Sequence, residues 1–169
     1  MKKRFALLSL VLFTLTVESS AMIADFQSST FKANTTIPSE YTCQGADKSP
    51  PLSWKNDSDK TQSYVLIVDD PDAPAGVWDH WILFNIPKDV TQIEEGQTPK
   101  GASTAKNSWG KTNWGGPCPP SGTHRYFFKL FALDTLLNFP ATPNKQELMT
   151  AMEGHVDGKS EFIGLYAKK

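Results

Sequence analysis

The sequence has only two cysteines and no excess of either charge. Among its 169 residues, 17 are Lys or Arg and 18 are Asp or Glu, which gives a formal net charge of −1. This balance argues against nucleic acid as a partner, because nucleic-acid-binding domains carry a marked excess of basic residues. The lack of a CxxC pair gives little support to a redox enzyme or a structural zinc site.

Motifs for covalent and metal catalysis are also missing. The chain has no Gly-x-Ser-x-Gly turn, and Cys118 lies between two prolines, so no activated nucleophile is evident. The three histidines, His80, His124 and His155, show no His-x-x-x-His spacing. We therefore expect a protein that is not an enzyme and uses no metal or other cofactor. A hydrolase based on an Asp-His pair is the weaker alternative.

The N-terminal residues 1–21 have the features of a signal peptide. Lys2, Lys3 and Arg4 precede an apolar segment that ends near Val17, and small residues follow up to Ala21. A membrane anchor is the alternative, but about 13 apolar-rich residues are too few for a span of roughly 20. We expect cleavage before residue 22, an exported protein that is periplasmic or secreted, and a single domain over residues 22–169.

Cys43 and Cys118 both remain after removal of the signal peptide and are 118 − 43 = 75 positions apart. In an oxidising compartment they could form a disulfide. Two free, buried thiols are the alternative, and the sequence leaves both open.

Three segments are predicted to form long strands. Residues 63–69 form a β-branched apolar run that is typical of a strand buried on both faces. Residues 78–86 alternate, with Trp78, His80, Ile82, Phe84 and Ile86 on one face. Residues 124–133 alternate in the same way and place His124 and Tyr126 on one face. Shorter strands are expected at 162–167 and in the N-terminal part.

One helix is predicted after residue 142. Thr142 can cap it, Pro143 suits the first position, and Gly154 ends it, with Leu148, Met149 and Met152 on one face. Residues 42–53 and 91–116 are rich in turn-forming residues and are expected to be long loops. The chain is therefore predicted to be mostly β.

Polar side chains follow the first long strand. Asp70 and Asp72 bracket Pro71, and Pro74 stiffens the same turn, so two carboxylates are held at a strand end. His80 follows a few residues later, and an aspartate bonded to its ring would fix the tautomer. An ordinary Asp-Pro turn and a core histidine bonded to one carbonyl are the alternatives.

The segment Gly115–Pro120 combines glycines with three prolines and is predicted to form a rigid wall. His124 and Tyr126 come directly after it and could donate hydrogen bonds to a phosphate or carboxylate. The alternative is a strand whose first residues merely meet solvent. Trp109 and Trp114, in a loop that also has Lys106 and Lys111, either contact lipid headgroups or fold back onto the sheet.

Several motifs in order resemble the phosphatidylethanolamine-binding protein family, in particular its bacterial Raf-kinase-inhibitor-like members. They are Tyr41-Thr42-Cys43-Gln44-Gly45, Ser49-Pro50-Pro51-Leu52-Ser53-Trp54, residues 70–74, residues 78–80, residues 116–126 and Ala151-Met152-Glu153-Gly154-His155-Val156. The resemblance implies a large antiparallel sheet packed on a smaller sheet, with one or two short helices. This sequence differs from those of animal members in having a short loop between Pro74 and Trp78 and in lacking a helix after the last strand.

The resemblance also implies a small anion pocket at one end of the sheets. Carried onto this sequence, its lining residues are Asp70, Asp72, Pro74, His80, Gly116, Pro117, His124 and Tyr126. The expected function is that of an exported, noncatalytic binding protein for phosphate-bearing ligands such as phosphoethanolamine headgroups, either free or at a phospholipid surface. The alternative is an inhibitor or modulator of a protein partner such as a kinase or protease. The natural ligand and the oligomeric state are left open.

Overall fold

The computed structural model describes residues 21–55 and 58–169. The predicted signal peptide, apart from Ala21, lies outside the described residues. Within the described part of the chain, no helix is long and apolar enough to span a bilayer.

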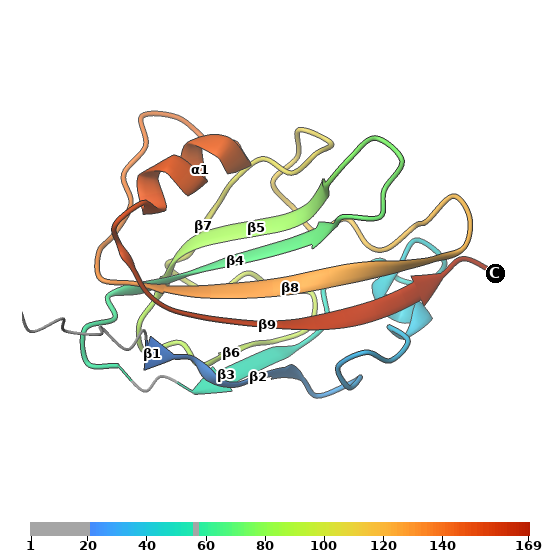
Figure 1. Ribbon diagram of the computed structural model, residues 1–169, viewed down its shortest axis with the longest axis horizontal. Coiled ribbons are helices and arrows are strands. Elements are labelled where there is room, and N and C mark those ends of the chain that lie inside the picture. Colours follow the sequence, from blue (N-terminus) through green and yellow to red (C-terminus); the bar gives the residue numbers. More distant parts are fainter. Residues whose placement is uncertain (1–20, 56–57) are drawn as a thin grey trace, which may run out of the picture.

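Two sheets face each other and build the fold (Figure 1). The larger sheet has the order β1-β9-β8-β4-β5-β7, and the smaller has the order β2-β3-β6. All pairs are antiparallel except β1 and β9. The strands of the larger sheet are β1 (Ala21–Met22), β4 (Ser63–Asp70), β5 (Trp78–Pro87), β7 (Ser103–Thr104), β8 (Thr123–Leu133) and β9 (Val156–Ala167). Those of the smaller sheet are β2 (Ala24–Ser28), β3 (Leu52–Lys55) and β6 (Gln92–Ile93).

The predicted mostly β fold with two packed sheets is therefore confirmed. A 3-10 turn, η1 (Ser39–Tyr41), and one helix, α1 (Lys145–Met152), complete the described elements. The last strand is longer than predicted, since it begins at Val156, and the expected loop 91–116 contains the short strands β6 and β7.

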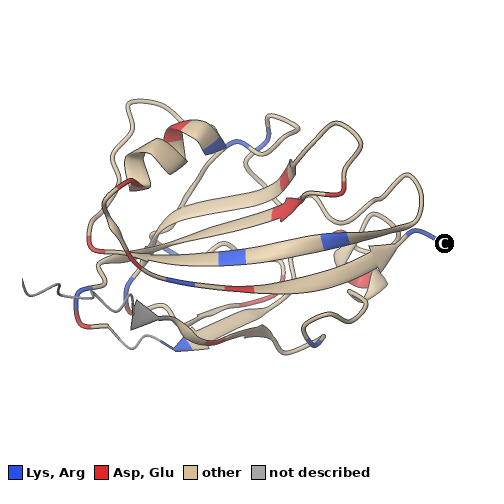
Figure 2. Ribbon diagram, in the orientation of Figure 1, with Lys and Arg blue, Asp and Glu red and all other residues tan. Residues whose placement is uncertain are grey.

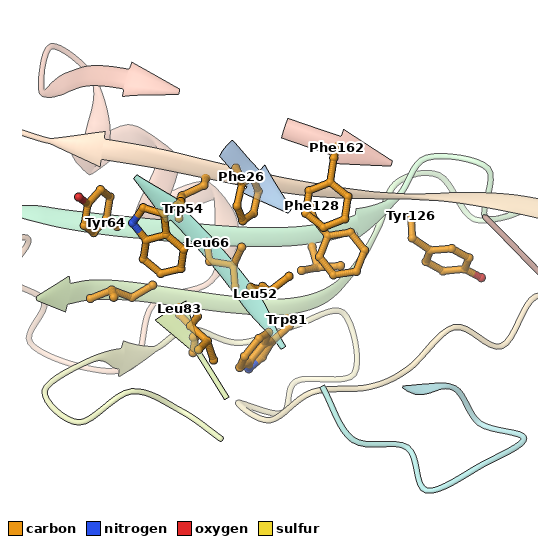
Figure 3. Close-up of a cluster of buried hydrophobic side chains, with 14 of the residues drawn as sticks. Phe26, Leu52, Trp54, Tyr64, Leu66, Trp81, Leu83, Tyr126, Phe128 and Phe162 are labelled. Atoms are coloured by element: carbon orange, nitrogen blue, oxygen red, sulfur yellow. The ribbon is translucent and has the colours of Figure 1, made fainter. Parts of the chain in front are cut away.

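The main hydrophobic core lies between the two sheets (Figure 3). Alternate residues of β4 and β8 point into it, and the rings of Phe128 and Phe162 stack with centroids 4.8 Å apart. A second core, which includes Ile67 and Ile82, lies on the other face of the larger sheet under Leu148 of α1. Because every residue of β4 is buried, this strand contributes to both cores, as its continuous apolar run predicted.

The predicted alternation of β5 holds only in part, because two register shifts interrupt its pairing with β4. Asn85 has a φ of 51° and bonds to the backbone of Leu137 through both side-chain atoms. This bulge places Ile86 between the sheets, whereas Ile82 and Phe84 pack in the second core. The second register shift falls at His80. As a result, the His80 ring contacts Tyr126 and does not pack in the second core.

The helix begins two residues later than predicted. Asn144, not Thr142, is the N-cap, and it forms a capping box with Glu147. Leu148 and Met152 are buried as predicted, but Met149 is exposed.

Cys43 and Cys118 form a disulfide that joins the segment after η1 to the loop before β8. We predict that the Cys43→Ala/Cys118→Ala variant loses about 4 kcal/mol in the free energy of unfolding, because the bridge closes a long loop in the unfolded chain. Urea unfolding of the oxidised protein and the variant measures this loss. Equal unfolding midpoints would show that the bridge does not stabilise the fold.

Candidate functional site: a pocket at the end of the larger sheet

A cavity of about 330 Å³ lies where β4 ends and where β5 and β8 begin. In Figure 1 the green β4–β5 loop and the orange loop before β8 extend from this end of the sheet. The lining residues are Asp70, Ala73, Pro74, Ala75, Trp78, His80, Trp109, Cys118, Pro119, Pro120, His124 and Tyr126. Five predicted site residues, Asp70, Pro74, His80, His124 and Tyr126, therefore meet in one cavity.

A buried Asp70–His124 pair forms one wall. His124 Nδ1 donates to Asp70 Oδ2 over 2.7 Å, and the backbone N–H of Asp72 donates to Asp70 Oδ1 over 2.8 Å. Both side chains are almost completely buried. Because the carboxylate accepts the hydrogen at Nδ1, the pair fixes the His124 tautomer and leaves Nε2 for the cavity.

His80 uses its Nδ1 in a similar way. Its ring N–H donates to the Gly115 carbonyl over 2.5 Å, and a carbonyl can only accept. Burial lowers the pKa of His80 below its usual value, and the Gly115 carbonyl and the nearby carboxylates of Asp70 and Asp79 oppose this effect only in part. His80 is therefore favoured in its neutral form, with a lone pair on Nε2.

Tyr126 adds a hydroxyl donor beside the two histidines. Its ring packs edge-on against His80 with centroids 5.2 Å apart. The hydroxyl is buried and makes no well-formed hydrogen bond to a described residue, although the Cys118 backbone lies near it. Burial raises the pKa of Tyr126, so the hydroxyl keeps its proton at neutral pH.

Asp72, Gly116 and Pro117 are not among the described residues that line this cavity. Asp72 accepts two hydrogen bonds from the Arg125 guanidinium and one from the backbone N–H of Arg125. These bonds lower the pKa of Asp72 to about 2. Gly116 donates its N–H to Asp47 over 2.8 Å, and a Cβ there would come within 2.6 Å of the Tyr41 carbonyl. These residues hold the loops around the pocket in place.

The sequence reasoning missed the aromatic part of the lining. Trp78 and Trp109 pack edge-on with centroids 5.3 Å apart, and Trp109 also packs against His80. Trp78 is two residues before His80 on the same strand, and this spacing could have identified it. Trp109 comes from a loop, where no periodic pattern indicates which residues face the pocket.

Within the described residues, no group of three or more His, Cys, Asp or Glu side chains is placed to hold a metal ion.

The buried His80 makes stability depend on pH. Its folded pKa lies below the unfolded value of about 6.5, so its contribution is complete above pH 6.5 and is lost as the pH falls through the folded pKa. We predict that the unfolding midpoint of the wild type decreases more between pH 7 and pH 5 than that of His80→Gln. An equal decrease in both proteins would contradict the prediction.

The family described as phosphatidylethanolamine-binding protein matches residues 27–167. A UPF0098 protein of Methanothermobacter thermautotrophicus is 50% identical over 137 residues, which are 78% of this chain and 91% of that protein. A UPF0098 protein of Pyrococcus horikoshii is 46% identical over 84% of this chain and 76% of that protein.

Two crystal structures share the fold. A phosphatidylethanolamine-binding protein homologue from Chlamydia trachomatis matches with a TM-score of 0.83 and 36% identity, over 89% of this chain and all of that chain. YbcL from E. coli, a member of the same family, matches with a TM-score of 0.79 and 29% identity, over 88% of this chain and all of that chain. The resemblance in the motifs, the match over residues 27–167 and the shared fold lead to one conclusion: the chain belongs to the phosphatidylethanolamine-binding protein family.

Proposed function

We propose that this chain is a noncatalytic binding protein whose pocket takes a phosphate-bearing ligand such as a phosphoethanolamine headgroup. One observation carries the proposal: two buried histidines with their Nδ1 atoms already bonded, to Asp70 and Gly115, line the same cavity as the Tyr126 hydroxyl. Their Nε2 atoms become donors when the rings are protonated. Three donors in one cavity suit the oxygens of a phosphate.

The rest of the lining suits an ammonium group on the same ligand. The acidic side chain of Asp70 and the aromatic rings of Trp78 and Trp109 line the same cavity. Carboxylates and aromatic faces both attract cations. A zwitterionic headgroup therefore matches the pocket better than inorganic phosphate does.

The surroundings of the Asp70–His124 pair favour binding over catalysis. Such a pair activates a serine or cysteine nucleophile in hydrolases. Here the cysteine that lines the cavity is Cys118, whose sulfur is in the disulfide. The described lining contains no serine or threonine.

Two features support the lipid-bound form of the headgroup and an exported protein. Val77 and Trp109, which are 55% and 44% exposed, are in the two loops beside the pocket, and the exposed Lys111 follows Trp109 in its loop. Exposed apolar and basic groups around an opening suit a membrane surface of mixed charge. The disulfide is typical of an oxidising compartment outside the cytoplasm.

We predict that the protein binds glycerophosphoethanolamine more tightly at pH 6 than at pH 8, with up to about a tenfold loss per pH unit, because burial favours the neutral form of His80 and this ring must gain a proton to donate from Nε2. This ligand is a phosphodiester and does not titrate between pH 6 and pH 8. A change in affinity over this range therefore comes from titration of the protein. Isothermal titration calorimetry at both pH values measures the affinity.

The His124→Ala variant should bind about tenfold or more weakly, because a hydrogen bond to a charged group is lost. His155→Ala, remote from the cavity, is the matched control and should bind as the wild type does. If the wild type gives no saturable heat at either pH, the proposed function is wrong.

For the lipid-bound form, we predict that the wild type floats with vesicles of phosphatidylethanolamine and phosphatidylglycerol. Val77→Asp should bind these vesicles about tenfold more weakly, since insertion of one valine contributes about 1.5 kcal/mol. Leu136→Asp changes a similarly exposed residue beyond the other end of β8 and is the control. Equal flotation of both variants would exclude docking through this rim.

A further inference from the structure

A cluster of charges lies behind the pocket, on the opposite face of the larger sheet. Asp69 precedes the pocket residue Asp70, and Asp79 precedes the pocket residue His80. Neighbouring residues of a strand point to opposite faces, so the two acids face α1 while Asp70 and His80 face the cavity. Figure 2 shows the acidic ends of β4 and β5 and the basic residue that begins α1.

Lys145, the first residue of α1, bridges the two acids. Its Nζ lies 3.1 Å from Asp69 Oδ2 and 2.5 Å from Asp79 Oδ1. Asp69 is 1% exposed and also accepts two hydrogen bonds from Lys129 Nζ. Asp79 is 14% exposed, and Lys145 is its ion-pair partner among the described residues.

The bridge spans the place where the pairing of β4 and β5 is irregular. Asp69 pairs with Asp79, Val68 pairs with Trp81, and His80 is the extra residue between them. Two carboxylates directly opposite each other on paired strands repel, and a bulge weakens the backbone hydrogen bonds that would resist them. A cation between the carboxylates changes this repulsion into attraction.

We infer that Lys145 is a positioning residue for the anion pocket. Lys145 is not a lining residue of the cavity. It holds the ends of β4 and β5 together on the opposite face of the sheet, and this fixes the positions of Asp70 and His80 relative to each other. The role as stated rests on the proposed function, since it is the affinity of the pocket that Lys145 would control.

Lys129 provides a matched comparison. It neutralises Asp69 at 2.7 Å, but it lies on β8 and forms no ion pair with Asp79. Removal of Lys129 therefore takes one cation from the cluster and leaves the β4–β5 bridge in place. Removal of Lys145 leaves the charge of Asp79 unpaired and opposite Asp69.

The test measures glycerophosphoethanolamine affinity by calorimetry for Lys145→Met and Lys129→Met. We predict about a tenfold loss for Lys145→Met and little change for Lys129→Met, in the range of effects transmitted through packed elements. Lys145→Arg, and the double variant Lys145→Met/Asp79→Asn, should recover most of the affinity, because one restores the bridge and the other removes the repulsion. A general loss of packing would not be rescued by Asp79→Asn.

The His80 ring signals in NMR spectra of the ligand-free protein provide a second readout. They should move in Lys145→Met and return toward wild-type positions in the double variant. If the wild type binds no headgroup, the proposed function fails, and these signals still test the positioning role. Unchanged affinity and unchanged His80 signals in folded Lys145→Met would overturn the inference, as would an equal loss in Lys129→Met.

Discussion

The complete burial of β4 is the constraint on which both the fold and the pocket depend. This strand pairs with β5 and β8 and faces the main core on one side and α1 on the other. Its apolar run ends in two consecutive buried aspartates, one on each face of the sheet. Each face must therefore supply partners that compensate the charge of one carboxylate. Asp70 is met by His124 on the cavity side, and Asp69 is met by Lys129 and Lys145 on the helix side. Burial without these partners would be very costly for either carboxylate.

The fold was predictable where one segment carries its own signal. The sequence segments of β4, β5 and β8 are long, apolar and regular, and this pattern correctly predicted three strands. The bulges at His80 and Asn85 were not predictable from alternation, because they depend on contacts with Tyr126 and with the backbone of Leu137. The helix start was misplaced although a local pattern marks it: Asn144 is followed three positions later by Glu147, as a capping box requires, whereas Thr142 is followed there by Lys145.

The pocket was predictable to the extent that its residues follow strand ends. Asp70, His80, His124 and Tyr126 sit at the ends of neighbouring strands, and the resemblance to a family linked them. The positions of the other residues around the pocket depend on tertiary contacts. Arg125 donates hydrogen bonds to Asp72, the N–H of Gly116 donates to Asp47, and Trp109 packs edge-on against His80. None of these long-range contacts has a local sequence pattern.

The ring nitrogens of His80 provide the most direct test of a histidine-based anion pocket. Long-range ¹H–¹⁵N NMR spectra at pH 7 distinguish the ring nitrogens with and without their hydrogens. In the free protein, we expect His80 to carry its hydrogen on Nδ1 and none on Nε2. Saturation with glycerophosphoethanolamine should protonate Nε2 of His80 and shift the signal of this nitrogen. A ligand that saturates the protein while the Nε2 signals of His80 and His124 stay unchanged would contradict an anion pocket built on these rings.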